Sequence, residues 1–131
     1  MKSIDKNPSL TNDPNMAKIN LGRAGENLAV EYLSEHGYTI LEQNWRWKKS
    51  ELDIIAKKGR TLVIVEVKTR SYDSMGAPEE AVGRDKEKIL LDAANQYAIH
   101  IGHDWAVQID IISIIIEGES SRLRHYEDAI Y

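Results

Sequence analysis

The sequence has 131 residues, of which 42% are hydrophobic and none is cysteine. This length and composition suit a single globular domain. The lack of cysteine excludes disulfide frameworks, thiolate zinc sites and cysteine nucleophiles, and it favours a reducing compartment such as the cytoplasm. The longest apolar runs are far shorter than the ~20 residues that cross a bilayer, so we expect a soluble protein without membrane association.

The 17 lysines and arginines and the 21 aspartates and glutamates are unevenly spread along the chain. Residues 42–70 carry eight basic side chains against four acidic ones, whereas residues 71–131 carry five against twelve. A basic segment inside an acidic chain can still form a local surface that binds anions. The net charge of −4 therefore does not exclude a nucleic-acid partner.

The N-terminal part of the chain divides into a tail and a helix. Residues 1–18 are polar, hold two prolines and show no apolar period, which predicts a disordered tail ahead of one domain over residues 19–131. Apolar residues then recur at helical spacing over residues 21–36, with Asn20 as a plausible N-cap and Gly37 as the stop.

Three strands are expected next, over residues 38–47, 51–57 and 61–70, with Gly59 in the turn between the last two. They should form an antiparallel meander. The third strand is apolar on both faces over residues 62–65, which is typical of a central strand covered on each side.

A second helix is predicted from the start signal at Pro78 to about Gly102. Residues 106–116 and 122–126 then read as two more strands. The resulting order, α-β-β-β-α-β-β, predicts an α/β or α+β fold in which two main helices flank a central mixed sheet.

Charged residues interrupt the predicted central strand. Glu66 and Lys68 are two apart and share one face of it. If the turn near Gly59 holds two or four residues, Asp53 of the preceding strand lies diagonal to or directly opposite Glu66, with Cα atoms roughly 5 to 8 Å apart. Two carboxylates at that distance repel each other unless a proton or a cation lies between them, and hard oxygen ligands suit Mg²⁺ or Mn²⁺.

A divalent cation held by Asp53 and Glu66 would polarise a phosphate and activate a water, while Lys68 orients that water or stabilises developing charge. This chemistry is phosphodiester hydrolysis. In the competing interpretation Glu66 with Lys68, like Glu51 with Lys57, is an ordinary ion pair on a solvated sheet face. Spacing alone leaves both interpretations open.

Aromatic and basic side chains alternate over residues 45–49, and with Arg70 they offer stacking and phosphate contacts. Because the chain has no phenylalanine, Trp45 is expected in the core, whereas Trp47 fits the core and the surface equally. Lys48 and its neighbouring lysine are equally explicable as solubilising charges.

Four motifs follow one another along the chain, namely Gly22-Arg23-x-Gly25-Glu26, Asn44-Trp45-Arg46, Glu51-Leu52-Asp53-Ile54-Ile55 and Val65-Glu66-Val67-Lys68-Thr69-Arg70. Together they resemble the motif series of the YraN family of predicted endonucleases. That family belongs to the PD-(D/E)XK nuclease superfamily and is similar to archaeal Holliday junction resolvases. The resemblance spans about residue 20 to the C-terminus and implies a restriction-endonuclease-like core.

The resemblance implies that Asp53 is the metal-binding aspartate, Glu66 the second acidic ligand and Lys68 the catalytic lysine. It also implies that Glu26 is a third acid, catalytic and metal-binding, contributed by the first helix. Helical spacing by itself favours Glu26 no more than Glu31, so this assignment depends on the motif.

For nucleic-acid contacts we expect Arg23, Arg46, Lys48, Arg70 and Lys86, the last because the family usually has a lysine where the second helix opens. The chain departs from the family pattern at Ser50, where glycine is common. It departs again at Gln108-Ile109-Asp110, which replaces Arg-Phe-Asp and removes a cation beside the sheet.

We therefore expect a Mg²⁺- or Mn²⁺-dependent DNA endonuclease of repair or recombination. Similarity to junction resolvases implies branched DNA as the substrate and a homodimer with two-fold symmetry. Two alternatives stay open, namely a nucleic-acid-binding module without hydrolysis and a protein-interaction domain that uses the acidic C-terminal part.

Overall fold

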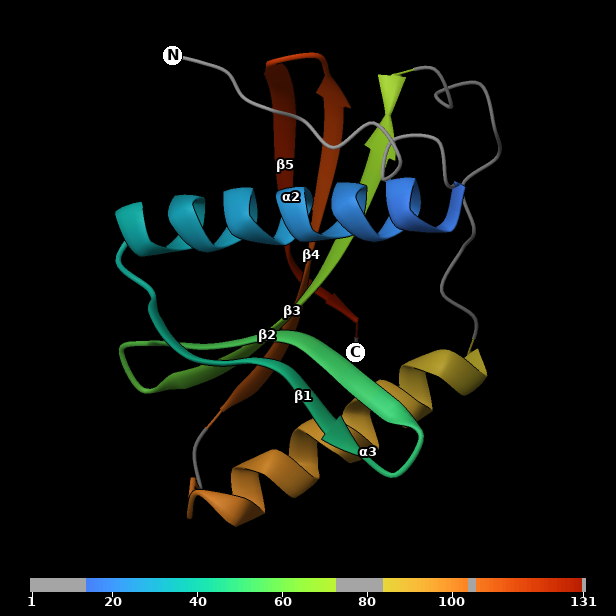
Figure 1. Ribbon diagram of the computed structural model, residues 1–131. Coiled ribbons are helices and arrows are strands. Elements are labelled where there is room, and N and C mark those ends of the chain that lie inside the picture. The colour runs from blue at the N-terminus through green and yellow to red at the C-terminus, as the bar shows by residue number, and fades with distance from the viewer. Residues whose placement is uncertain (1–13, 73–83, 104–105, 131) are drawn as a thin grey trace.

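The computed structural model describes residues 14–72, 84–103 and 106–130. Within these residues two helices, α2 (Pro14–Glu35) and α3 (Arg84–His100), flank a five-stranded sheet (Figure 1). The strands are β1 (Thr39–Trp47), β2 (Ser50–Lys58), β3 (Thr61–Ser71), β4 (Val107–Glu117) and β5 (Ser120–Ile130). The expected order α-β-β-β-α-β-β and the α+β class are confirmed.

The five strands lie in the sheet in sequence order, with β3 in the centre. β3 and β4 run parallel, whereas every other neighbouring pair is antiparallel, so the sheet is mixed as expected. Parallel neighbours need a crossover connection, and α3 lies in the segment that links β3 to β4. The crossover places α3 on the opposite face of the sheet from α2 (Figure 1).

Each helix covers one face of the sheet. On one face, Ala29 and Leu33 of α2 pack with Ile54, Val65 and Ile112. All five side chains are fully buried, and burial of a large aliphatic side chain contributes roughly 1.5–3 kcal/mol. This cluster fixes α2 across the middle of the sheet.

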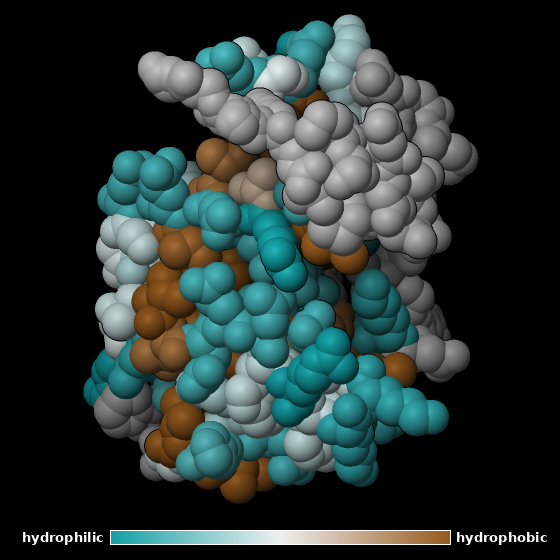
Figure 2. All heavy atoms as spheres, in the orientation of Figure 1, coloured by the Kyte–Doolittle hydropathy of each residue, from teal (hydrophilic) through white to brown (hydrophobic). Residues whose placement is uncertain are grey.

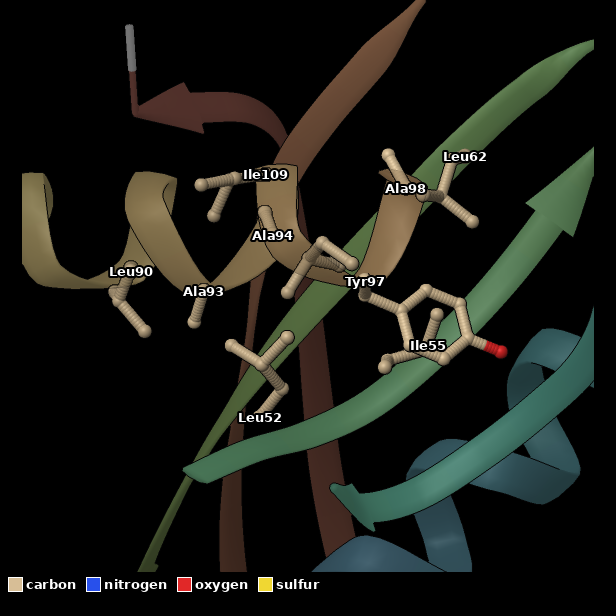
Figure 3. Packing of buried hydrophobic residues seen from close by; sticks show 10 residues of the cluster. Leu52, Ile55, Leu62, Leu90, Ala93, Ala94, Tyr97, Ala98 and Ile109 are labelled. Atoms are coloured by element: carbon tan, nitrogen blue, oxygen red, sulfur yellow. The ribbon is translucent and has the colours of Figure 1, made fainter. Parts of the chain in front are cut away.

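On the other face, α3 presents small side chains to the strands (Figure 3). Ala93 and Ala94 are fully buried and let the helix axis come close to the sheet, where Leu52 and Leu62 meet them. Tyr97 fills the space beside the alanines and meets the indole of Trp45 edge to face, with ring centroids 5.1 Å apart. Trp45 is partly buried against this cluster, in line with its expected place in the core.

Three hairpins connect the antiparallel strands, and each has a two-residue turn. The first turn residue has a positive φ in all three, namely 57° at Lys48, 60° at Gly59 and 58° at Gly118. Glycine adopts this conformation without steric cost, whereas a residue with a Cβ does not. The turn of two residues at Gly59 is one of the lengths considered from the sequence.

The ends of several elements differ from expectation. α2 begins at Pro14 instead of residue 21, so residues 14–18, assigned to the tail, are helical, while residues 1–13 lie outside the described residues. Proline suits a first helical position, and a helix can extend past its apolar stripe on backbone hydrogen bonds alone. β5 is longer than residues 122–126, and the start signal expected at Pro78 lies outside the described residues.

The surface is mainly polar on the face drawn in Figure 2, where hydrophilic side chains surround separate hydrophobic patches. Among the described residues, Ile99 and Ile89 are the most exposed of the large hydrophobic side chains, at 70% and 50%. Neither α2 nor α3 is both long and apolar enough to span a bilayer.

Candidate active site

The pairing between β2 and β3 ends next to Asp53. Their ladder ends with Ile54 opposite Val65, a register that places Asp53 at the level of Glu66. Oδ2 of Asp53 instead accepts a hydrogen bond of 2.9 Å from the backbone N–H of Val67. The carboxylate of Asp53 therefore takes the place of a backbone acceptor where the two strands diverge.

The alternation of side chains along β2 is interrupted at the same place. Leu52 and Ile55 both pack on the α3 side of the sheet, although strict alternation puts residues three apart on opposite faces. Ile54, between them, packs on the α2 side. The backbone around Asp53 is thus twisted out of regular strand geometry.

β1 is distorted at the matching level. Gln43 pairs with Ile54 and Trp45 with Leu52, so Asn44 lies opposite Asp53, and Asn44 has a φ of 55°. Asparagine is among the non-glycine residues that best tolerate this left-handed conformation. The sequence predicts no role for Asn44, although an asparagine inside a predicted strand, at the start of the second motif, is a signal for one.

Burial dominates the electrostatics of Asp53. Loss of solvent raises the pKa of its carboxyl group to about 6, and the nearby charges of Glu26 and Glu51 act in the same direction. The N–H of Val67 and the ammonium of Lys86 oppose the shift. A cation bound beside Asp53 would therefore stabilise the ionised form of its carboxyl group.

Glu66 is perturbed further in the same direction. Burial and then the charge of Asp53 raise the pKa of its carboxyl group to about 8, against the opposing effects of Lys86 and Lys68. Its Oε2 is buried and has no hydrogen-bond partner among the described residues. A buried acceptor without a partner is costly, so this oxygen is suited to a proton, a water or a cation.

Glu26 reaches the site because of the residue before it. Gly25 is buried where α2 crosses β3, and a Cβ there would lie 1.8 Å from Oγ1 of Thr69. Glycine therefore permits the close approach that sets Glu26 beside Asp53. A cavity of about 450 Å³ opens here, lined by Leu21, Gly22, Glu26, Asp53, Val67, Thr69 and Arg70.

The structure also distinguishes the surroundings of Glu26 from those of Glu31, which helical spacing treats as equivalent. Glu31 lines a different cavity, together with the turn at Gly118 between β4 and β5. Glu51 is exposed and forms an ion pair of 3.4 Å with Arg46. Among these carboxylates of uncertain role, Glu26 alone shares a cavity with Asp53.

The basic residues expected at the site fall into three groups. Arg70 lines the cavity of Asp53, and the exposed Lys86, in the first turn of α3, acts on both carboxylates. Arg46 and Lys48 lie at the end of the β1–β2 hairpin. Arg23 lies exposed on α2.

The donor set fits a divalent cation in an open coordination sphere. Asp53 and Glu66 supply hard oxygen ligands, and the pKa of each carboxyl group is raised. One of these oxygens, Oε2 of Glu66, is buried and has no hydrogen-bond partner among the described residues. Within the part of the chain that the structure describes, no three His, Asp or Glu side chains converge tightly enough to hold a metal by themselves. Water and a substrate phosphate would therefore complete the coordination of Mg²⁺ or Mn²⁺.

Asp110 belongs to a separate network. It is fully buried, and its Oδ2 lies 2.7 Å from Nε2 of His125, while Oδ1 accepts hydrogen bonds from Gln108 and from the backbone N–H of Asp128. The hydroxyl of Tyr32 lies 3.0 Å from Nδ1 of His125. The network ties α2 to β4 and β5, and Gln108, the departure from the family pattern, still provides Asp110 with a donor.

Fold and site together define an α+β domain with two partly buried carboxylates and neighbouring lysines where the central strands diverge. Residues 25–114 match a family described as Uncharacterised protein family UPF0102. The chain therefore belongs to the UPF0102 family, which confirms the family expected from the four motifs.

Individual relatives agree with this assignment over most of the chain. A UPF0102 protein of Flavobacterium psychrophilum is 46% identical over 117 residues, which cover 88% of this chain and 98% of the relative. One of Bacteroides thetaiotaomicron is 50% identical over 117 residues, covering 88% and 97%. One of Thermodesulfovibrio yellowstonii is 40% identical over 116 residues, covering 88% and 100%.

Proposed function

We propose that the protein is a metal-dependent endonuclease that hydrolyses phosphodiester bonds in DNA. The observation that carries the proposal is the meeting of Asp53 and Glu66 where β2 and β3 diverge, with a buried oxygen of Glu66 left without a partner. The motif resemblance to PD-(D/E)XK nucleases supports the same assignment of these residues.

The side chains have distinct roles in this proposal. Bound Mg²⁺ or Mn²⁺ supplies a Lewis acid that polarises the scissile phosphate and lowers the pKa of a water. The N–H of Val67 donates to Oδ2 of Asp53 and so fixes the orientation of the whole carboxylate, including Oδ1. Lys68, partly buried next to Glu66 on β3, holds the attacking water or neutralises charge that develops on the phosphate.

Glu26 and the cations complete the proposed site. Glu26 acts as a third acid from across the 450 Å³ cavity, and Arg70 in its wall and Lys86 beside it contact the backbone of the substrate. Similarity to junction resolvases favours branched or otherwise structured DNA, and it favours a homodimer, since a four-way junction has two symmetric cleavage positions.

The proposal is tested with labelled linear, nicked, flapped and four-way-junction DNA, each incubated in EDTA, Mg²⁺ or Mn²⁺. We expect cleavage of at least one structure that depends on the metal and is lost in Asp53→Asn and Glu66→Gln. Glu31→Gln is the matched control, because Glu31 is exposed on the same helix as Glu26 but lines another cavity. Full activity of Asp53→Asn would overturn the assignment.

The same samples separate the two alternative functions. Salt-dependent binding of DNA without cleavage of any structure would favour a non-catalytic binding module. Absence of binding at low salt would favour a protein-interaction domain that uses the acidic C-terminal part.

A further inference from the structure

Lys48 occupies a position where the other two hairpins of this sheet have glycine. Its φ of 57° matches those of Gly59 and Gly118, yet its Cβ makes this left-handed conformation unfavourable. A strained residue that persists in a tight turn points to a role for its side chain. A binding role for the side chains of this turn would explain why the strained residue persists there.

A cavity of about 400 Å³ lies between this turn and α3, a volume within the range of small-molecule sites. It is lined by Trp47, Lys48, Lys49, Ser50, Ile89 and Asp92. Trp47 is held from behind, since it packs against the buried cluster under α3. Ile89 is 50% exposed and adds an apolar wall to the cavity.

The chemistry of this cavity suits a flat ring attached to a phosphate. The ammonium of Lys48 lies 4.5 Å from the centroid of the Trp47 ring, an exposed cation–π contact of the weak kind. A nucleobase stacked on the indole gains more than that contact supplies, and the displaced ammonium stays close to the phosphate of the same nucleotide. Lys49 adds a second cation on the turn.

Asp92 is the one acidic side chain in the lining, and its charge is partly balanced. Lys88 lies 3.2 Å from its Oδ2 on the same helix. A carboxylate at the rim of a base site accepts hydrogen bonds from ring or exocyclic N–H groups. Asp92 is thus compatible with a base, although it disfavours a bare phosphate.

The cavity lies close to the candidate active site along one strand. Ser50 at its edge and Asp53 are three residues apart on β2, which corresponds to about 10 Å. Base stacking on a protein side chain requires a base that has left its own stack. A nucleotide bound here would therefore belong to an unpaired stretch only a few nucleotides from the bond to be cleaved.

We propose that the β1–β2 turn and α3 form a binding site for an unpaired nucleobase of single-stranded DNA, with Trp47 as the stacking platform and Lys48 as the phosphate contact. The location of this site next to the cleaved bond rests on the proposed nuclease function. Binding itself does not, because it needs neither the metal nor the carboxylates.

The test measures the affinity of the full chain in EDTA for a labelled oligothymidylate and for a blunt duplex of equal length, by fluorescence anisotropy. We expect Trp47→Ala to weaken single-strand binding by roughly 5- to 160-fold, the range typical of one stacked base, with a change below about 3-fold for the duplex. We expect Lys48→Gly to weaken single-strand binding while the melting temperature stays the same or rises, since glycine relieves the strain.

Lys58→Ala is the matched control for charge and for the ring contact. Nζ of Lys58 lies 4.6 Å from the centroid of the Tyr38 ring, at the far end of β2 from the turn. This variant should alter single-strand and duplex binding equally. If Trp47→Ala fails to fold, Trp47→Phe replaces it, and loss of the oligonucleotide-induced quenching of tryptophan fluorescence is then the expected result.

The outcomes distinguish this inference from the proposed function. A folded Trp47→Ala protein that binds the oligothymidylate as tightly as the unsubstituted chain overturns the base site, even if metal-dependent cleavage is intact. Trp47-dependent binding with no cleavage of any DNA structure upholds the base site and refutes the nuclease.

Discussion

Gly25 of α2 and Thr69 of β3 approach so closely that a Cβ on Gly25 would fall 1.8 Å from Oγ1 of Thr69 and 2.8 Å from its Cβ. This contact sets the height of the helix above the sheet. Glu26 follows directly on α2, and Thr69 lines the same cavity as Asp53. Gly25, the second glycine of the first motif, therefore helps to position the carboxylate of Glu26 beside Asp53.

Gly25→Ala should destabilise the protein by about 1–3 kcal/mol, because the added methyl group overlaps the partly buried side chain of Thr69. The measurement is the free energy of unfolding in urea. Thr69→Ala in the same chain should recover only part of the loss, since the Cβ of residue 69 still lies 2.8 Å away.

Gly22→Ala is the matched control for that substitution. Gly22 lies three residues earlier in α2, and a Cβ there meets nothing within 4 Å. Alanine in a helix interior is favoured over glycine by roughly 0.5–1 kcal/mol, so this variant should be more stable. Equal stability changes for Gly22→Ala and Gly25→Ala would contradict the proposed role of the contact with Thr69.

Glu66→Gln should stabilise the metal-free protein, increasingly so as the pH rises. The pKa of Glu66 is about 8 in the folded protein against 4.5 for an unperturbed glutamate. Between these values the folded state keeps a proton that the unfolded chain has released, so wild-type stability falls as the pH rises. Glutamine has no such proton to lose.

The difference between the two proteins should be near zero at pH 4.5 and exceed about 1 kcal/mol at pH 8.5, as measured by urea denaturation in EDTA. Glu31→Gln removes an exposed carboxylate and should stay within about 0.5 kcal/mol of the wild type at every pH. A stability difference for Glu66→Gln that does not change with pH would show that Glu66 is solvated like Glu31.

Mn²⁺ or Mg²⁺ should raise the melting temperature, because a divalent cation binds the carboxylates of Asp53 and Glu66 in the folded protein and displaces the proton that Glu66 otherwise keeps. A metal concentration of ~100 times the dissociation constant adds roughly 2.7 kcal/mol, and millimolar affinity at an open site gives less. Differential scanning fluorimetry should show that Asp53→Asn loses this shift whereas Lys68→Ala keeps it. Identical shifts in the wild type and in Asp53→Asn would place the metal elsewhere.

Asp110→Asn should destabilise the protein without affecting the response to metal. Oδ1 accepts from Gln108 and from the backbone N–H of Asp128, and Oδ2 faces Nε2 of His125, so an amide at this position either leaves one N–H group unpaired or forces the ring of His125 into its other tautomer, at a cost of about 1–3 kcal/mol. Asp92→Asn, which removes an exposed ion pair with Lys88, should cost less than about 1 kcal/mol. A lost metal shift in Asp110→Asn would instead link its network to the carboxylate site.

The sequence by itself determined the order of the elements and the central strand. Helical and strand periods are local properties, and β3 is apolar on both faces, with Leu62 and Ile64 towards α3 and Val63 and Val65 towards α2. These features follow from spacing along the chain. For the turn at Gly59 the sequence left two or four residues open, and the two-residue turn of the structure brings Asp53 level with Glu66.

Only the tertiary structure decided which residues surround the two carboxylates. Glu26 and Glu31 are equivalent by helical spacing, and the contact between Gly25 and Thr69 separates them. The positive φ of Asn44 opposite Asp53 depends on neighbouring strands that are distorted together. Periodicity reports which face of an element a residue occupies, whereas the distance between two elements is set by the side chains packed between them.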